Sequence, residues 1–191
     1  MGKELYEQFD EVKDIFHQAN DVLGRDIAKI CFEGPDDELL KTTNAQPALF
    51  LVSIALLTLL KKEGVSFDYV AGHSLGELTA YYAAGVYDLQ TALEIIQKRG
   101  QAMADSYPQE KSGMLAVMGM AEADLNELIQ PYQSAPVVIA NYNCPGQLIV
   151  SGEKSALEQV TNDIKAKGSK VIPLKVAGAF HSPLMQSASD E

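Results

Sequence analysis

The residues best suited to chemistry are Gly72-His73-Ser74-Leu75-Gly76, a serine between two glycines. The apolar stretch 67–72 before this motif predicts a short strand, and 75–84 after it predicts a helix. A serine on a strained strand-to-helix turn is typical of a nucleophile that forms an acyl-enzyme ester. The N–H of Leu75 at the helix start could donate a hydrogen bond to the oxyanion that develops during acylation. The alternative is that Ser74 only caps the helix; the agreement of motif and context favours the nucleophile.

A nucleophilic serine needs a general base, and the chain has three histidines. His17 lies among acidic residues on the first predicted helix, so we expect it at the surface. His73 adjoins Ser74, and we expect it to position the turn rather than to accept the proton. By elimination His181 is predicted to be the base, with a structural role as the alternative.

Arg99 falls on the apolar stripe of a helix predicted over 89–103, whose members are Ala92, Ile95, Ile96, Ala102 and Met103. An arginine that faces inward needs an anion, since an uncompensated buried charge is costly. One candidate anion is a buried Asp or Glu. The other is a substrate carboxylate held by both arms of the guanidinium, which beside Ser74 would select a dicarboxylic half-thioester.

The composition excludes several classes of protein. The net charge is −11, with eleven acids in residues 1–40, so nucleic acid is not an expected partner. Cys31 and Cys144 are far apart and show no metal-ligand spacing, so no metal site is expected. Acyl transfer through a serine needs no redox cofactor, so no cofactor is expected either. The start of the chain has no apolar leader, and the longest apolar run, 48–60, has 13 residues. We expect a cytoplasmic protein without a membrane partner.

The order of elements predicts an α/β fold. An amphipathic helix over 3–23, a loop over 33–41 and a central apolar helix from Gln46-Pro47 to Leu60 precede the serine motif. From residue 113 the pattern is strand, helix, strand, strand, helix, strand, over 113–120, 121–130, 136–141, 147–151, 154–167 and 169–174. We therefore predict a parallel-sheet domain (1–112 and 176–191) with an inserted β-α-β-β-α-β lobe (113–175).

Taken together, these residues resemble the malonyl-CoA:acyl carrier protein transacylases and the acyltransferase domains of fatty acid and polyketide synthases. The resemblance rests on segments in the family's order: Gln46-Pro47-Ala48-Leu49, Ala71-Gly72-His73-Ser74-Leu75-Gly76-Glu77, Arg99-Gly100, Asn143-Cys144-Pro145-Gly146-Gln147 and Gly178-Ala179-Phe180-His181-Ser182-Pro183-Leu184-Met185.

The resemblance implies an α/β-hydrolase-like domain with an inserted ferredoxin-like lobe, and two substrates, malonyl-CoA and acyl carrier protein. It implies that Ser74 carries the malonyl ester, that His181 is the base and then the acid, and that Arg99 binds the malonyl carboxylate. Leu75 N–H would be half of the oxyanion hole. The resemblance also places Gln46 and Met103 in the pocket lining, and Phe180 matches the malonyl-selective pattern.

The chain also departs from the family pattern. The family opens with a strand and a glutamine-bearing loop and continues beyond the His-Ser-Pro-Leu-Met segment, so we expect both ends to be lacking here. This leaves open an acyl-thioester hydrolase of the same fold, or an inactive docking or scaffold domain. Fatty acid and polyketide synthesis are both open. Four lysines are candidates for docking an acidic carrier, with a solvated charge run as the alternative: Lys165, Lys167, Lys170 and Lys175.

Overall fold

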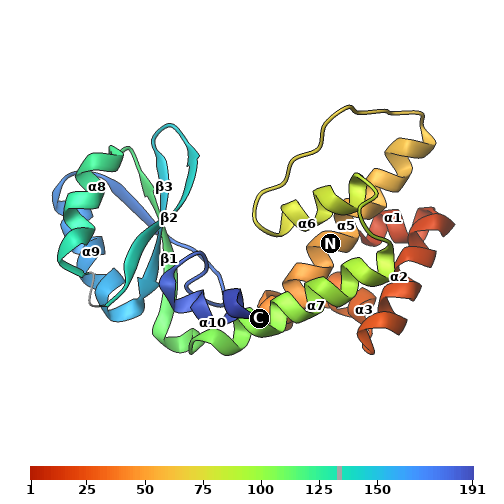
Figure 1. Cartoon of the computed structure of the whole chain (residues 1–191), viewed down its shortest axis with the longest axis horizontal. Coiled ribbons are helices and arrows are strands. Elements are labelled where there is room, and N and C mark those ends of the chain that lie inside the picture. Colours follow the sequence, from red (N-terminus) through yellow and green to blue (C-terminus); the bar gives the residue numbers. More distant parts are fainter. Residues whose placement is uncertain (133–134) are drawn as a thin grey trace. The chain divides into compact units, whose positions relative to one another are not determined.

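The structure is a computed structural model that describes residues 1–132 and 135–191. It divides into two compact units, 1–101 and 102–191, and the boundary falls inside helix α7 (Leu89–Ser106). In Figure 1 the first unit is helical and holds a long extended segment between two of its helices, whereas the second is built on a sheet.

The first unit packs its helices around one apolar core. They are α1 (Lys3–Gln8), α2 (Asp10–Leu23), α3 (Ile27–Glu33), α4 (Asp36–Leu40), α5 (Thr42–Lys62), α6 (Leu75–Ala83) and the first part of α7. The helix predicted over 3–23 is divided at Phe9, whose backbone is extended, and Gly24 ends α2 in the left-handed conformation, as its position suggested. The loop predicted over 33–41 contains the short α4.

Helix α5 is the centre of the first unit and begins at Thr42, before the expected Gln46-Pro47 start. Pro47 has no N–H to offer the carbonyl of Thr43, and the Arg25 guanidinium donates to that carbonyl instead, at 2.6 Å. The helix has 21 residues, so by length and composition it could cross a membrane, unlike the 13-residue apolar run considered above. A core helix passes the same test, and α5 contributes nine buried residues to the unit.

The strand predicted over 67–72 is absent: this stretch belongs to neither a helix nor a strand and forms the extended segment between α5 and α6 in Figure 1. A strand exists only through hydrogen bonds to a neighbour. Within the described residues nothing pairs with 67–72, and all strand pairs found there are antiparallel, so the expected parallel sheet is not seen. Tyr69 is 93% exposed, and a hollow of about 460 Å³ separates this segment from α5 and α6.

The second unit has the element order that the sequence predicted. It comprises β1 (Ser112–Met118), α8 (Glu122–Ile129), β2 (Val137–Cys144), β3 (Gln147–Glu153), α9 (Lys154–Ala166) and β4 (Lys170–Pro173). The strands pair in the order β2-β3-β1-β4. Short helical turns lie at η1 (Gln109–Lys111), η2 (Gln130–Tyr132) and η3 (Pro183–Met185), and α10 (Gln186–Asp190) follows the last of these.

The two faces of this sheet are covered differently. Because side chains alternate along a strand, Leu115 and Val117 of β1 pack under α8 and α9, whereas Met114 and Ala116 point to the opposite face. Figure 1 shows both helices on one side of the strands. The opposite face is covered by the segment after β4, which carries the residues around His181.

Candidate active site

Ser74 lies on a strained turn at the start of α6. Its φ of 54° and ψ of −113° are rare for a residue with a side chain, and α6 begins at the next residue, Leu75. A Cβ on Gly72 would lie 1.8 Å from the carbonyl oxygen of Gly76, so only glycine permits this approach. Within the described chain the Ser74 side chain makes no capping hydrogen bond to α6, which argues against a purely capping role.

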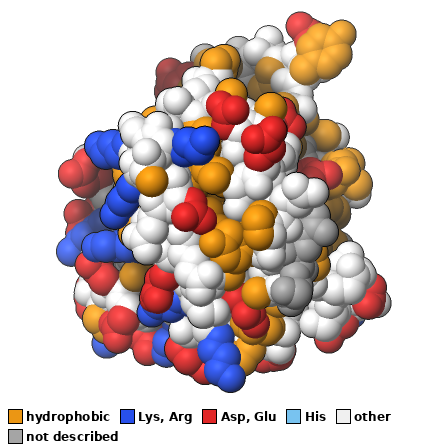
Figure 2. Space-filling model, turned by 90° about the vertical axis from the view of Figure 1, so that its left-hand side faces the viewer, with side chains coloured by type: hydrophobic (Ala, Val, Ile, Leu, Met, Phe, Trp, Pro, Cys, Tyr) orange, Lys and Arg blue, Asp and Glu red, His pale blue; other side chains and the backbone are white. Residues whose placement is uncertain are grey.

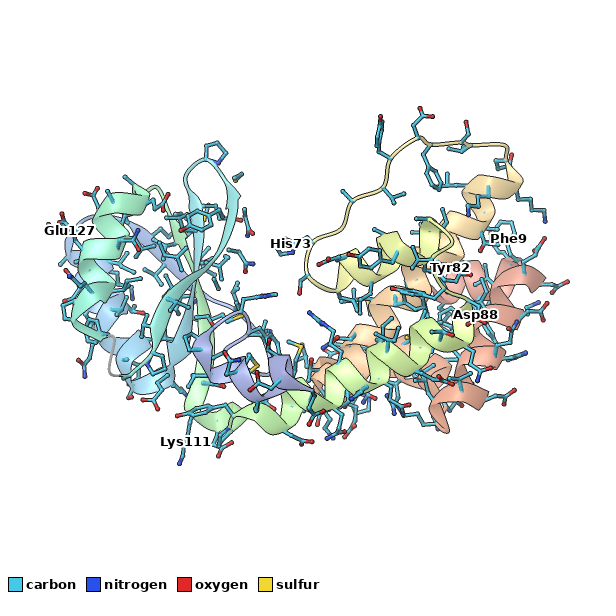
Figure 3. The ribbon with its side chains drawn as sticks, in the orientation of Figure 1. Phe9, His73, Tyr82, Asp88, Lys111 and Glu127 are labelled. Carbon is cyan, nitrogen blue, oxygen red and sulfur yellow. The ribbon has the colours of Figure 1, made fainter. Side chains whose placement is uncertain are left out.

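Two backbone hydrogen bonds close the turn. Gly76 N–H donates to the His73 carbonyl at 2.9 Å, and Glu77 N–H donates to the Ser74 carbonyl at 3.1 Å. His73 is exposed on the segment that enters α6, as Figure 3 shows, and its positioning role stays a prediction. Leu75 is buried and occupies the first helical position, where N–H groups have no intrahelical acceptor.

The structure brings Arg99 and Gln46 to Ser74. Arg99 Nη2 donates to Ser74 Oγ at 3.3 Å, and Arg99 Nη1 donates to Gln46 Oε1 at 2.5 Å. The amide of Gln46 is buried and donates through Nε2 to Thr42 Oγ1 at 2.9 Å. Three helices thus meet at this point, α5 with Thr42 and Gln46, α6 with Ser74, and α7 with Arg99.

The guanidinium of Arg99 is half-buried and hydrogen-bonds to uncharged oxygens. Burial lowers its pKa, and the charge of Glu77 raises it; arginine nevertheless stays protonated. Among the described residues no carboxylate forms a salt bridge with Arg99. The buried Asp or Glu that was one of the two expected partners is therefore not found in residues 1–132 and 135–191.

The predicted apolar stripe of α7 needs one correction. Ala92, Ile96 and Ala102 are buried, but Ile95 is 39% exposed and Leu93 takes its place in the core. The prediction placed both members of the apolar pair Ile95-Ile96 in the stripe, but only Ile96 faces inward, and it left out Leu93. Arg99 follows Ile96 by three residues, so it still lies beside the core.

His181 and Phe180 belong to the second unit. His181 has φ 57°, and Ser182 brackets it: the Ser182 hydroxyl donates to the Ala179 carbonyl at 2.6 Å and accepts from Leu184 N–H at 3.3 Å. Phe180 packs on the face of the sheet opposite α8 and α9. Met103, also in the second unit, is half-buried. The roles of these three residues beside Ser74 stay predictions.

Residues 1–191 match the family described as acyl transferase domain. The chain belongs to this acyl transferase family. It is 40% identical over 194 residues to the malonyl CoA-acyl carrier protein transacylase of Bacillus subtilis (strain 168), with 100% of this chain and 61% of that protein covered. It is 39% identical over 194 residues to the polyketide biosynthesis malonyl CoA-acyl carrier protein transacylase PksC of the same strain, with coverages of 100% and 65%.

Solved structures of acyl transferases agree with this assignment. The malonyl CoA-acyl carrier protein transacylase from Clostridium perfringens Atcc 13124 has a TM-score of 0.90 and 36% identity, over 100% of this chain and 60% of that one. A malonyl-transacylase in complex with its type II PKS acyl-carrier protein has a TM-score of 0.94 and 35% identity, over 100% and 62%. The chain thus spans about three fifths of the length of these relatives.

Sequence reasoning did not single out three residues that lie next to predicted site residues within their own units of this acyl transferase chain. Thr42 supports Gln46 from one helical turn away, and the i,i+4 spacing of two polar residues in an apolar helix was a signal. Ser182, followed by Pro183, has the pattern of a capped turn. Glu77 contributes charge near Arg99, and its place in the first turn of α6 was visible in the sequence.

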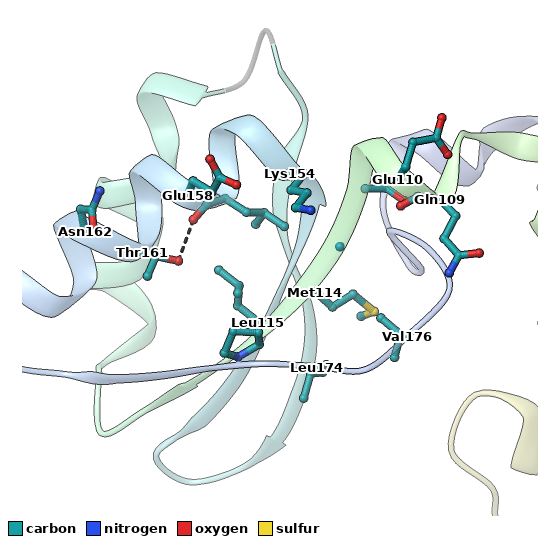
Figure 4. A pocket seen from close by; sticks show the side chains of 14 residues that line it. Gln109, Glu110, Met114, Leu115, Lys154, Glu158, Thr161, Asn162, Leu174 and Val176 are labelled. Carbon is teal, nitrogen blue, oxygen red and sulfur yellow. Dashed lines mark hydrogen bonds between the residues drawn. The ribbon is translucent and has the colours of Figure 1, made fainter. Parts of the chain in front are cut away.

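A larger hollow of the acyl transferase chain lies elsewhere. It has a volume of about 820 Å³ and lies beside the start of β1, α9 and residues 173–176 of the second unit (Figure 4). Its lining includes the charged Glu110, Lys154 and Glu158 but none of the predicted site residues. His17, the remaining histidine, is exposed next to the Tyr6 hydroxyl at 3.0 Å, as expected for a surface residue.

Proposed function

We propose that the chain is the greater part of a malonyl-CoA:acyl carrier protein transacylase, an acyltransferase that works through a malonyl-serine ester. The observation that carries this proposal is the placement of the Arg99 guanidinium 3.3 Å from Ser74 Oγ, with neutral oxygens as its hydrogen-bond partners. A cation held beside a nucleophile favours an acyl group with a carboxylate of its own. The names of the relatives point to the same substrates.

The first half-reaction transfers the acyl group from CoA to serine. His181 takes the Ser74 hydroxyl proton as Oγ attacks the malonyl thioester carbonyl, and Leu75 N–H donates to the oxyanion that forms. The carbon–sulfur bond then breaks, and the departing CoA sulfur receives the proton from His181. A malonyl ester on Ser74 and free CoA result. No metal or redox cofactor takes part.

The second half-reaction repeats the chemistry with a different nucleophile. His181 takes the proton of the phosphopantetheine thiol of acyl carrier protein, and the sulfur attacks the malonyl ester. The Ser74–acyl bond breaks and Oγ recovers its proton, which releases malonyl carrier protein. Throughout both steps Arg99 holds the distal malonyl carboxylate, while Gln46, Met103 and Phe180 line the pocket, and His73 positions the turn.

We propose the corresponding domain organisation as well. Residues 1–112 and 176–191 belong to an α/β-hydrolase-like core, and 113–175 form a ferredoxin-like inserted lobe. The support is the strand order β2-β3-β1-β4 with two helices on one face, together with the turn at Ser74 that leads directly into α6. The protein acts in the cytoplasm, in fatty acid or polyketide synthesis.

Intact-mass spectrometry after brief incubation with malonyl-CoA tests the covalent step. A malonyl adduct on the parent chain, absent from Ser74→Ala, is the expected result. Folded parent protein that gains no malonyl group would contradict the proposal for this chain. An adduct with acetyl-CoA alone would assign a different acyl donor.

Arg99→Ala tests the choice of substrate. Removing the guanidinium should lower malonyl loading by at least about 100-fold, because a charge-assisted contact is lost, while acetyl loading is kept or increased. If malonyl loading survives, Arg99 does not bind the carboxylate.

Two further measurements separate the proposed function from its alternatives. Rapid release of free acid from a Ser74 ester without any carrier protein would favour a hydrolase. Failure of a fluorophosphonate to label Ser74 in folded protein would favour a scaffold.

A further inference from the structure

Thr42 opens α5 in the first unit, and the residue is buried, with 6% of its surface exposed. Its hydroxyl oxygen accepts a hydrogen bond from Gln46 Nε2 at 2.9 Å, and Gln46 Oε1 accepts from Arg99 Nη1 at 2.5 Å. The other arm of Arg99 reaches Ser74. Thr42 is therefore connected to the nucleophile through two side chains.

The chemistry of the three groups fixes how they must be arranged. A guanidinium only donates hydrogen bonds, so Gln46 must present its oxygen to Arg99 and direct its NH₂ group away. That NH₂ group lies in a buried position at the start of α5, where an acceptor stabilises it. The Thr42 hydroxyl is such an acceptor, and it lies one turn before Gln46, where residues four apart share a helix face.

The backbone under Thr42 is itself held in place. Arg25 Nη2 donates to the adjacent Thr43 carbonyl at 2.6 Å. On the α7 side, a Cβ on Gly100 would lie 3.2 Å from the Thr42 carbonyl oxygen, so the two helices approach closely there. The Thr42 hydroxyl thus has a fixed position from which it can orient Gln46.

We propose that Thr42 is a positioning residue for the acyl-binding arginine: its hydroxyl holds the Gln46 amide, which holds one arm of Arg99 so that the other arm stays beside Ser74. This inference rests on the proposed function. Arginine has a long, flexible side chain, and ordering it before the ligand arrives reduces the entropy lost on binding. Thr42 should therefore matter for acyl groups that carry a carboxylate and not for those that lack one.

The test compares Thr42→Val with Thr42→Ser in the full chain, by the rate of ester formation at Ser74 with malonyl-CoA and with acetyl-CoA. Valine keeps the shape and removes the acceptor, whereas serine keeps the hydroxyl. We expect Thr42→Val to lower kcat/KM for malonyl loading about tenfold, mainly by raising KM, because a misplaced arginine binds the malonyl carboxylate less well. Acetyl loading should change by less than about twofold, and Thr42→Ser should resemble the parent in both reactions.

A double-variant cycle shows whether Thr42 acts through Gln46. If it does, Thr42→Val should add little to the effect of Gln46→Leu, because the two changes break one connected network. Independent, additive effects would overturn the proposal, as would a malonyl-to-acetyl ratio unchanged by Thr42→Val. If the valine variant does not fold, Thr42→Ala removes the same acceptor and replaces it in the cycle.

Arg99→Ala separates failure of this inference from failure of the proposed function. If Arg99→Ala keeps malonyl loading, the proposed function fails whatever Thr42 does. If Arg99→Ala loses it and Thr42→Val does not, the function stands and the positioning role is wrong. Side-chain ¹H–¹⁵N NMR needs no activity: Thr42→Val should shift the Gln46 amide and Arg99 signals, and an unmoved Arg99 signal would overturn the proposal.

Discussion

At the scale of single residues, Ser182 holds the backbone on both sides of the proposed base. Its hydroxyl donates to the Ala179 carbonyl and accepts from Leu184 N–H, and His181 between them has a left-handed φ of 57°. Such a conformation is costly for a residue with a side chain and persists only where neighbours enforce it. Ser182 thus holds the backbone from which the imidazole of the proposed base projects.

We expect Ser182→Ala to lower the rate of malonyl-Ser74 formation about tenfold, because the imidazole loses its fixed orientation. Loss of the cap should also reduce the free energy of unfolding by about 1 kcal/mol. Ser182→Thr keeps the hydroxyl and serves as the matched control. The measurement is the pH dependence of loading, together with thermal unfolding of each variant. If Ser182→Ala unfolds at a lower temperature but loads malonyl at the parent's rate, Ser182 has only a structural role.

The two cysteines should differ sharply in reactivity. Burial raises the pKa of the Cys31 thiol to about 11, whereas Cys144 is exposed. Since the thiolate is the reactive form, iodoacetamide at pH 8 should alkylate Cys144 in the native protein and Cys31 only after unfolding. Peptide mass mapping with and without denaturant measures this. Alkylation of Cys31 at the same rate in both states would show that it is not buried.

The same pKa shift predicts a pH dependence of stability. Between the ordinary thiol pKa of 9.0 and about 11, the native state keeps a proton that the unfolded chain releases, so the free energy of unfolding falls as pH rises through this window. The fall should be steeper in the parent than in Cys31→Ala, which lacks the group. Denaturant unfolding at pH 8 and pH 10.5 gives the change in the free energy of unfolding for the parent and for Cys31→Ala. Equal changes in the two proteins would contradict the raised pKa of Cys31.

Residue types alone predicted much of the candidate site, and contacts supplied the rest. Ser74 and Arg99 could be singled out because a serine between glycines and an arginine on an apolar stripe are unusual. Thr42 was not singled out, because the i,i+4 spacing allows a contact with Gln46 but does not show that the contact forms. Ile95 was placed in the core wrongly because apolar neighbours on a helix compete for one inward position.

At the scale of elements, Gly100 sets the approach of α7 to the start of α5. A Cβ there would lie 3.2 Å from the Thr42 carbonyl oxygen and from Thr43 Cα, and both are backbone atoms that cannot turn aside. We expect Gly100→Ala to displace the first turn of α5, destabilise the protein by about 1–3 kcal/mol and lower malonyl loading.

Gly113→Ala is the control for that change, because its Cβ would meet Leu157 at an ordinary 3.5 Å. Denaturant unfolding and adduct mass measure the two outcomes. Full activity and stability in Gly100→Ala would show that α5 and α7 can separate at no cost, and that the close approach does not hold the site together.

Elements whose signals are local were predicted well, and those that depend on a partner were not. The helix boundary at Gly24 and the strand-helix order of the second unit follow from short-range patterns. The segment 67–72 has the composition of a strand, yet no described neighbour offers it backbone groups. Phe9 interrupts the first helix through an extended backbone that amphipathic periodicity does not encode.

At the scale of the whole molecule, a net charge of −11 opposes at long range the docking of the proposed partner, an acidic carrier protein. Productive contact then needs a local cluster of cations. The candidates are all exposed in the second unit, around the end of α9, at the start of β4 and just beyond β4: Lys165, Lys167, Lys170 and Lys175. One face of this unit, seen in Figure 2, has several basic side chains gathered along one side.

Charge reversal separates docking from chemistry. We expect Lys167→Glu with Lys170→Glu to reduce malonyl transfer to the carrier by about tenfold, because rim charges act mainly on association. Loading of Ser74 from malonyl-CoA should stay within about twofold of the parent, since the acyl site itself is unchanged. The control pair, Lys3→Glu with Lys29→Glu, alters the net charge equally but lies on exposed positions of the first unit. Transfer is measured by the mass of the carrier at several salt concentrations. If both pairs lose transfer equally, total charge governs the encounter; if neither does, the carrier docks elsewhere.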